Sequence, residues 1–489
     1  MFKVLQIVVY LFVVCFTNVA TADDPAPRHS TAIVQTIGKV QPAVAAVYVR
    51  KNGGQGAGSG SVIDPRGYVL TAKHVVGDAH VVLLAGRPPL QAQLIGTMPE
   101  YDLALLKLGR KAFDRPASPT YPLAGTPPAF IPLGRADEIM LGESILNIGS
   151  PGGRGIVVTR GIISSLGISG GNALSLATQS SNGFNQFLQF DAANNPGNSG
   201  GALVNEIGQQ IGLVTSSIRG EEGVHFAVPP DTIRQSISEM LNSELRHRYV
   251  SGITVDPQLG LVTVTRVDAA SPADKAGIKS GDVIVSINGR PLRDPIDWEF
   301  TRFELRPEQK IELGLKRGAS EHSAALTLAK REPQPGVTVE DAAPGLLSRA
   351  AEYDPRMADP LSDDVRPAGP PSVIAEVTAT PPNLPRDEHY EVLMEGYLKI
   401  DEPGLYRLAL KSDDGSKLFV HDRLTLDNGG NHAAQLRTGW ADLSAGLHPI
   451  RIEYYEDQGH EVLELLMAKG DEDLRPVTSE ELLHARLPE

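Results

Sequence analysis

The chain has 489 residues, which is too long for one ordinary core and suggests about three or four domains. Hydrophobic residues make up 41% of it, a fraction that excludes a wholly disordered protein. A formal net charge of -14 excludes a global basic field for gripping nucleic acid or an anionic membrane, so we expect no nucleic-acid partner.

Residues 1–22 have the three parts of a secretory signal peptide. Lys3 precedes an apolar stretch from Val4 to Phe16, and Ala20-Thr21-Ala22 forms a small-residue cleavage site before acidic residues. We therefore expect export, to the periplasm or to the cell envelope and extracellular space. A retained anchor is the alternative, but the apolar stretch is short for a span of about 20 residues.

Cys15 is the single cysteine and leaves with the signal peptide. The sequence therefore predicts neither a disulfide nor a thiolate metal site in the mature chain. No later stretch is long and apolar enough to span a bilayer, and we expect a soluble or peripherally attached product.

Residues 23–247 are predicted to form a first domain that is mainly β. Short β-like runs punctuated by Gly and Pro follow one another from Ile33 to about Leu245, as in a sandwich or barrel. Among them, Gly54 to Gly60 is interpreted as a flexible turn between strands. Helical spacing first occurs at Pro230 to Leu245, where we expect a closing helix with Asp231 as its N-cap.

Residues 248–332 contain strand-like runs and two predicted helices, a pattern that indicates an α+β unit. The first helix opens at Ser271-Pro272, because Ser accepts hydrogen bonds from free backbone amides and Pro suits the first helical position. A longer helix is predicted to begin at Asp294-Pro295.

Residues 333–372 are rich in Pro, Ala, Asp and Glu and are predicted to be a partly extended linker. Residues 373–480 alternate strand-like runs with turns and are predicted to form a third, all-β module. We find no repeat between the domains.

Ser199 lies in the Gly-rich stretch NNPGNSGGAL, for which three chemistries compete. The nucleophile elbow of α/β-hydrolases requires a helix after the serine, whereas Ala202 to Val204 is predicted as a strand. A phosphate-binding loop requires a Gly-Lys-Ser/Thr ending, which this stretch lacks. A catalytic triad requires an imidazole and a carboxylate, and His74 and Asp102 lie beside predicted strands upstream. Either residue, taken alone, is more often structural.

The stretches LTAKHVV, YDLALLK and PGNSGGAL, which carry these three residues, resemble the HtrA/DegP family of trypsin-fold serine proteases. The resemblance covers essentially Ile33 to Lys330. It implies a trypsin-like double β-barrel with His74 as general base, Asp102 as the carboxylate that orients it, and Ser199 as nucleophile.

The same resemblance assigns two further parts of the site. The backbone amides of Gly197 and Ser199 would form the oxyanion hole. The specificity pocket would be lined by Val224, His225, Phe226 and Ala227. His225 departs from the small residue that is common in the family at this position, which puts the size of the pocket in doubt.

The stretches Ser271 to Ile278 and Gly281 to Gly289 resemble the PDZ domain of bacterial proteases. Such domains add a peptide as an extra strand and bind its C-terminal carboxylate on loop amides. The resemblance places this loop at Val250, Gly252 and Ile253, with one residue more than the usual short form. A purely structural PDZ domain is the alternative.

The last module resembles the protective-antigen type of β-sandwich, which often accompanies secreted hydrolases and adhesins. In its sugar-binding members paired aspartates coordinate calcium, which makes Asp413 and Asp414 candidate ligands and Asn428 a weaker one. An Asp-Gly turn with a side-chain-to-backbone hydrogen bond is the favoured alternative.

Together these observations predict a mainly β protein that is an exported HtrA-like serine endopeptidase and needs no cofactor for catalysis. Its partners would be unfolded or C-terminal peptide segments and cell-surface glycans, and family resemblance predicts a homo-oligomer, a trimer. The alternative is a non-catalytic or conditionally active peptide- or glycan-binding scaffold.

Overall fold

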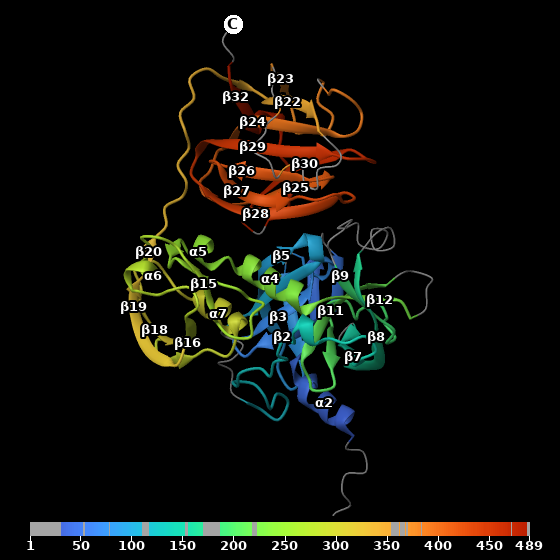
Figure 1. Cartoon of the computed structure of the whole chain (residues 1–489). Helices are drawn as coiled ribbons and strands as arrows, with labels where there is room; N and C mark the ends of the chain where they lie inside the picture. Colours follow the sequence, from blue (N-terminus) through green and yellow to red (C-terminus); the bar gives the residue numbers. More distant parts are fainter. Residues whose placement is uncertain are drawn as a thin grey trace, which may run out of the picture.

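The computed structural model describes residues 31–51, 54–77, 79–109, 117–151, 155–169, 186–217, 223–353, 361, 367, 370–382, 384–470 and 472–486. The predicted signal peptide, residues 1–22, lies outside them. Within the described ranges, no helix combines the length and the apolar character needed to cross a membrane. Figure 1 shows the C-terminal β module on one side of the molecule, facing both the first domain and the PDZ domain.

The first domain consists of two closed, six-stranded antiparallel barrels, which confirms the predicted double β-barrel. The first barrel has the order β1-β2-β3-β6-β5-β4, and the second has the order β10-β11-β12-β9-β8-β7. Their strands are β1 (Val44–Lys51), β2 (Gly54–Asp64), β3 (Tyr68–Ala72), β4 (Ala79–Leu84), β5 (Leu90–Met98), β6 (Leu103–Leu108), β7 (Ser144–Gly149), β8 (Val157–Ser169), β9 (Gln186–Phe190), β10 (Ala202–Asn205), β11 (Gln210–Ser217) and β12 (His225–Val228).

The glycines at the start of β2 are part of a strand, so the predicted flexible turn at Gly54 to Gly60 is wrong. A Cβ atom at Gly58 would lie 2.6 Å from a methyl carbon of Val75. One at Gly60 would lie 3.0 Å from a methyl carbon of Val47. Close packing of neighbouring side chains, and not chain flexibility, explains Gly58 and Gly60.

Helix α2 (Ala32–Val40), capped by Thr31, precedes the first barrel and was not predicted. Helix α4 (Pro230–Leu241) closes the domain as expected, but its N-cap is Pro229, and Asp231 lies in the first turn. Because proline suits the first helical position, Pro230 moves the start of the helix ahead of the aspartate. The short helix α5 (Ser243–Arg246) follows α4.

The PDZ domain has both predicted helices, α6 (Pro272–Lys275) and α7 (Pro295–Arg302). Ser271 Oγ accepts the amide of Asp274, and the Asp294 carboxylate accepts the amide of Asp297, as expected of N-caps. Its strands are β13 (Tyr249–Val250), β14 (Ile253–Val255), β15 (Val264–Val267), β16 (Val283–Ile287), β17 (Arg290–Pro291), β18 (Lys310–Arg317), β19 (Ser320–Thr327) and β20 (Ala329–Lys330).

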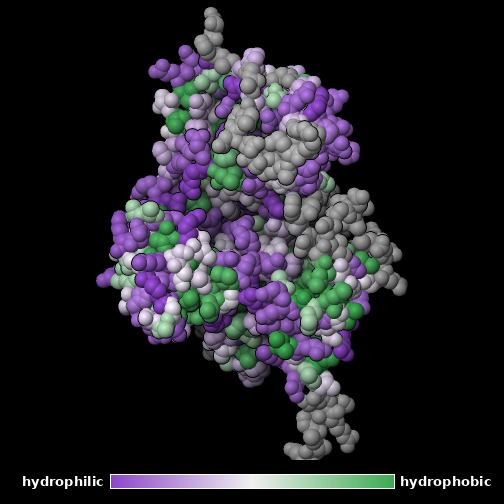
Figure 2. All heavy atoms as spheres, in the orientation of Figure 1, coloured by the Kyte–Doolittle hydropathy of each residue, from purple (hydrophilic) through white to green (hydrophobic). Residues whose placement is uncertain are grey.

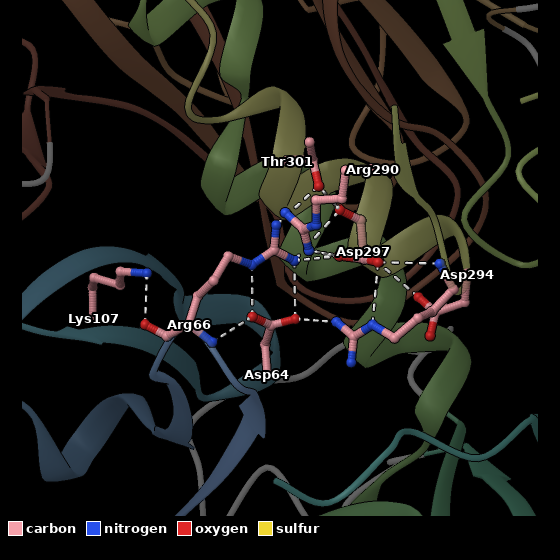
Figure 3. A network of polar contacts seen from close by, with 8 residues as sticks. Asp64, Arg66, Lys107, Arg290, Asp294, Asp297 and Thr301 are labelled. Atoms are coloured by element: carbon pink, nitrogen blue, oxygen red, sulfur yellow. Dashed lines mark hydrogen bonds and ion pairs between the residues drawn. The ribbon is translucent and has the colours of Figure 1, made fainter. Parts of the chain in front are cut away.

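Helix α7 fixes the PDZ domain to the first barrel. The Phe300 ring stacks on Tyr68 with centroids 3.9 Å apart. Beside this contact lies a bridging network formed by Asp64, Arg66, Arg290, Arg293 and Asp297 (Figure 3). Both carboxylate side chains are only 1% exposed. Apolar and charged contacts therefore join the two domains at one place.

The C-terminal module consists of a larger sheet with the path β21-β32-β24-β29-β26-β27, to which β22 and β23 are added, and a second sheet, β28-β25-β30-β31. The strands are β21 (Ala342–Pro344), β22 (Leu346–Glu352), β23 (Ser372–Ile374), β24 (Tyr390–Ile400), β25 (Gly404–Asp413), β26 (Ser416–Val420), β27 (Arg423–Asn428), β28 (Gln435–Leu443), β29 (Gly446–Glu456), β30 (Val462–Lys469), β31 (Arg475–Pro476) and β32 (Leu482–Ala485). The apolar core of the module comes from both sheets.

Two predicted limits of this module are wrong. Strands β21 and β22 lie within the predicted linker 333–372, and β22 pairs with β24 from Leu347 to Glu352. At the other end, β32 continues the larger sheet beyond residue 480. On the buried face of β22, the polar Ser348 lies beside Leu346. The composition of this stretch therefore resembles that of a linker, which explains why the sequence did not predict a strand here.

Candidate active site

His74 and Asp102 are presented by two short turns of the first barrel. His74 lies in η2 (Lys73–Val75), directly after β3, and Asp102 follows η3 (Pro99–Tyr101). His74 Nδ1 is 2.7 Å from Asp102 Oδ2, and the backbone amide of His74 donates to Asp102 Oδ1 at 2.9 Å. The carboxylate therefore fixes the imidazole through Nδ1, the orientation in which Nε2 serves as a base.

Thr215, in β11, connects the two barrels at this point and was not identified from the sequence. Its Oγ1 donates to Asp102 Oδ2 at 2.8 Å, and its carbonyl accepts Ser199 Oγ at 3.3 Å. Thr215 thus links Ser199 to Asp102, which in turn binds His74. Because a hydroxyl has one hydrogen, Ser199 must exchange the Thr215 carbonyl for the imidazole before it can transfer its proton.

The loop that carries Ser199 directs its carbonyls into the protein. Ser59 Oγ donates to the Gly197 carbonyl at 2.7 Å, and the Ser59 amide donates to the Ser199 carbonyl at 2.9 Å. The Asn198 carbonyl accepts the amide of Gly201 at 2.7 Å. Among the described residues, the backbone amides of Gly197 and Ser199 donate to no hydrogen-bond acceptor. An oxyanion hole requires backbone amides that can donate to the substrate in this way.

Close approach explains two glycines around this loop. Gly200 has a φ of +83°, and a Cβ atom there would lie 2.3 Å from the Ser59 carbonyl oxygen. At Gly149 a Cβ atom would lie 2.8 Å from Asn198 Oδ1. The Gly-rich stretch therefore serves to seat a serine turn between two barrels.

Three family models match the chain: a trypsin-like peptidase domain at residues 58–213, a PDZ domain at 263–300 and a PA14 domain at 344–476. The probable periplasmic serine endoprotease DegP-like of Ectopseudomonas mendocina is 34% identical over 298 residues, 57% of this chain and 57% of that protein. The periplasmic serine endoprotease DegP of Escherichia coli is 34% identical over 290 residues, 55% and 56% of the two chains. The first two domains of this chain are therefore similar to serine endoproteases of the DegP type.

The chain spans little more than half the length of these curated relatives, 57% and 56%. Among solved structures, the serine endoprotease from Yersinia pestis is 30% identical and covers 62% of this chain and 100% of its own, with a TM-score of 0.35. The HtrA-type protease AlgW with tripeptide is 32% identical and covers 62% and 98%, with a TM-score of 0.36.

The residues predicted to line the specificity pocket lie at β12. Phe226 and Ala227 are buried, and Val224, just before the strand, is half-buried. His225 is 8% exposed, and the centroid of its ring lies 5.5 Å from that of Phe190. Burial lowers the pKa of His225, against the opposing effect of Asp191, so we expect a neutral ring at this position at neutral pH.

The predicted peptide-carboxylate loop of the PDZ domain lies between β13 and β14. Val250 ends β13, Ile253 begins β14, and Gly252 between them has a φ of +78°. The Ile253 amide donates to Ser251 Oγ at 3.2 Å. One of the predicted loop donors is therefore already used within the chain.

Asp413 and Asp414, the predicted calcium ligands, bind backbone amides in the C-terminal module. Three of their four carboxylate oxygens accept backbone amides, from His432, Ala434 and Asp457. Asn428 Nδ2 donates to Ser412 Oγ at 2.8 Å. In the described ranges no group of three or more His, Cys, Asp or Glu side chains could hold a metal ion. These are side-chain-to-backbone hydrogen bonds of the kind that the alternative interpretation expects, and calcium binding at the two aspartates stays a prediction.

The turn η3, which leads into Asp102, is also the docking surface for the C-terminal module. Arg437 Nη1 donates to Tyr101 Oη at 2.6 Å, and Thr438 Oγ1 donates to Glu100 Oε1 at 3.2 Å. Arg437 and Thr438 belong to β28. No sequence pattern indicated this contact, because it joins segments more than 300 residues apart.

Proposed function

We propose that this HtrA-type protein is a serine endopeptidase in which His74, Asp102 and Ser199 act as a triad. The observation that carries the proposal is the set of hydrogen bonds at Asp102, whose carboxylate binds the ring and the amide of His74 and the hydroxyl of Thr215. A carboxylate held in this way orients an imidazole and stabilises its positive charge during proton transfer.

The reaction follows from this geometry. Neutral His74 takes the proton of Ser199 Oγ while Oγ forms a bond to the carbon of the scissile amide. The carbonyl oxygen becomes negatively charged, and the amides of Gly197 and Ser199 bind it. The C–N bond then breaks as His74 returns the proton to the leaving amine, and water hydrolyses the acyl-enzyme by the same steps. No cofactor takes part.

The signal-peptide pattern at residues 1–22, and relatives that are named periplasmic serine endoproteases, support export to the periplasm. Unfolded or envelope proteins would be the substrates, and the PDZ domain would bind peptide segments.

Exposed apolar side chains on the second barrel support a homo-oligomer. Figure 2 shows hydrophobic surface over this barrel, and the exposed residues include Met140, Leu141 and Ile162. Apolar patches of this kind often mark protein–protein contacts. Calcium and glycan binding by the PA14 domain stay predictions from resemblance.

A fluorophosphonate probe tests the proposal, because it reacts with activated serines. We expect it to label the wild-type protein and not Ser199→Ala, and we expect this variant to lose cleavage of unfolded casein by a factor on the order of 10⁶ in kcat. Ser164→Ala, on β8, is the matched control and should behave as the wild type. Cleavage by Ser199→Ala at the wild-type rate would refute the triad, and an unlabelled wild type would favour a binding scaffold.

A further inference from the structure

The loop between β13 and β14 of the PDZ domain already holds a carboxylate of this chain. The amide of Ser251 donates to Glu244 Oε1 at 3.1 Å, and Ser251 Oγ donates to the same oxygen at 2.5 Å. Glu244 belongs to α5, just before the PDZ domain. A side-chain carboxylate therefore occupies the loop at which the PDZ resemblance places the carboxylate of a peptide.

Two arginines complete the surroundings of this carboxylate. Arg302, at the end of α7, has Nη2 3.9 Å from Glu244 Oε1. Arg331 has Nη2 3.8 Å from Oε2. An amide, a hydroxyl and two guanidinium groups converge on one carboxylate, a donor set that binds carboxylates strongly.

The loop keeps its shape through bonds that do not involve Glu244. The Ser251 carbonyl accepts the amide of Ala273 at 3.0 Å, and the Gly252 carbonyl accepts the amide of Asp268 at 3.0 Å. The loop that binds the carboxylate is thus held in shape by the PDZ domain itself, whereas Glu244, which supplies the carboxylate, lies on α5.

The element that carries Glu244 is small. Helix α5 has four residues, and residues with positive φ, Asn242 and Arg248, lie on either side of it. Since so short a helix contains few hydrogen bonds, moving Glu244 out of the site disrupts little regular structure.

We propose that Ser251, Arg302 and Arg331 form a carboxylate-binding site that Glu244 closes, and that a peptide with a free C-terminal carboxylate binds there by displacing Glu244. This inference rests on the peptide-binding role of the PDZ domain in the proposed function. It makes Glu244 an internal competitor, so that only peptides able to replace its carboxylate bind the PDZ domain.

Binding measurements on the full chain test the proposal, with Ser199→Ala present throughout to prevent cleavage. The probe is a fluorescein-labelled eight-residue peptide with a C-terminal valine, prepared with a free carboxylate and as the amide, and binding is followed by anisotropy. We expect Glu244→Ala to bind the free-carboxylate peptide at least about tenfold more tightly than its parent, and to leave binding of the amide unchanged. Glu244→Gln, which keeps the shape of the side chain, should tighten binding less.

Glu312→Gln is the matched control, because it removes a carboxylate from the exposed face of β18 in the same domain. It should bind as the parent does, and circular dichroism establishes that each variant is folded. Should Glu244→Ala fail to fold, Glu244→Gln decides. Equal affinity of parent and Glu244 variants for the free-carboxylate peptide would overturn the role of Glu244 and leave PDZ binding intact. Absence of binding by every variant would overturn the peptide site as well, while fluorophosphonate labelling of Ser199 in the wild-type chain, measured separately, would still report on the protease.

Discussion

Ser59 is a fully buried hydroxyl on β2 with a donor and an acceptor bond. It donates to the Gly197 carbonyl at 2.7 Å and accepts the amide of Ser150 at 2.8 Å. Replacing it by alanine would leave both partners buried without this hydrogen bond, at a cost of about 1–3 kcal/mol for each unsatisfied group. The loop could then relieve the loss by turning its peptide groups, and so misplace the oxyanion amides.

We therefore expect Ser59→Ala to lower kcat by about tenfold to hundredfold with little change in KM, because loss of an oxyanion contact acts on the transition state. Steady-state kinetics on a peptide substrate measures this. Ser61→Ala is the control, since it removes a buried hydroxyl of the same strand that donates to Gln210 Oε1 at 2.8 Å. The same kcat loss in both variants, after correction for folded fraction, would mean that Ser59 acts only on stability.

At the scale of elements, the bridging network joins α7 to the first barrel. Burial opposes ionisation of Asp297, but Arg293 and Arg66 hold the pKa of its carboxyl below the usual range. Asp297→Ala would leave Arg66, whose side chain is 14% exposed, without this partner, and we expect a loss of about 3–5 kcal/mol in unfolding free energy and a lower thermal midpoint. Differential scanning calorimetry measures the shift. Asp137→Ala, whose side chain is 65% exposed, should change nothing measurable; an equal effect of both substitutions would contradict the special role of the network.

Elements with a local cause could be predicted from sequence, and those set by distant partners could not. The helices after Ser271 and Asp294 begin where predicted, because their caps are neighbours in the chain. Strand β22 was missed because its evidence is its pairing with β24. At the site, sequence motifs indicated the triad residues but not Ser59 or Thr215. Ser59 binds Gly197, and Thr215 binds Asp102, each more than 100 residues away in the chain. Only the folding of the barrels brings these residues into contact.

At the scale of the whole molecule, the C-terminal module contacts η3, the turn that leads into Asp102, the carboxylate of the proposed triad. Besides the contacts of β28 with η3, Arg407 Nη1 donates to Thr97 Oγ1 at 2.9 Å, and Arg248 Nη2 lies 3.0 Å from Asp442 Oδ1. A cavity of ≈ 850 Å³ remains between the module, the first domain and the residues after the PDZ domain. The module is thus docked by polar contacts around a hollow interface, and this makes its docking sensitive to charge.

Glu100, buried at this interface, makes the assembly sensitive to pH. Burial raises the pKa of Glu100 to about 7 from 4.5, and Arg437 and Thr438 only partly oppose the shift. Because the folded state holds this proton more tightly than the unfolded chain, the stabilisation is present below pH 4.5 and is lost as the pH rises through 7, by up to about 3 kcal/mol.

Glu100→Gln keeps the neutral shape of the side chain at every pH. We expect its thermal midpoint to match the wild type at about pH 5 and to exceed it at about pH 8.5. Since other groups titrate equally in both proteins, parallel midpoint curves would mean that Glu100 does not titrate at this interface.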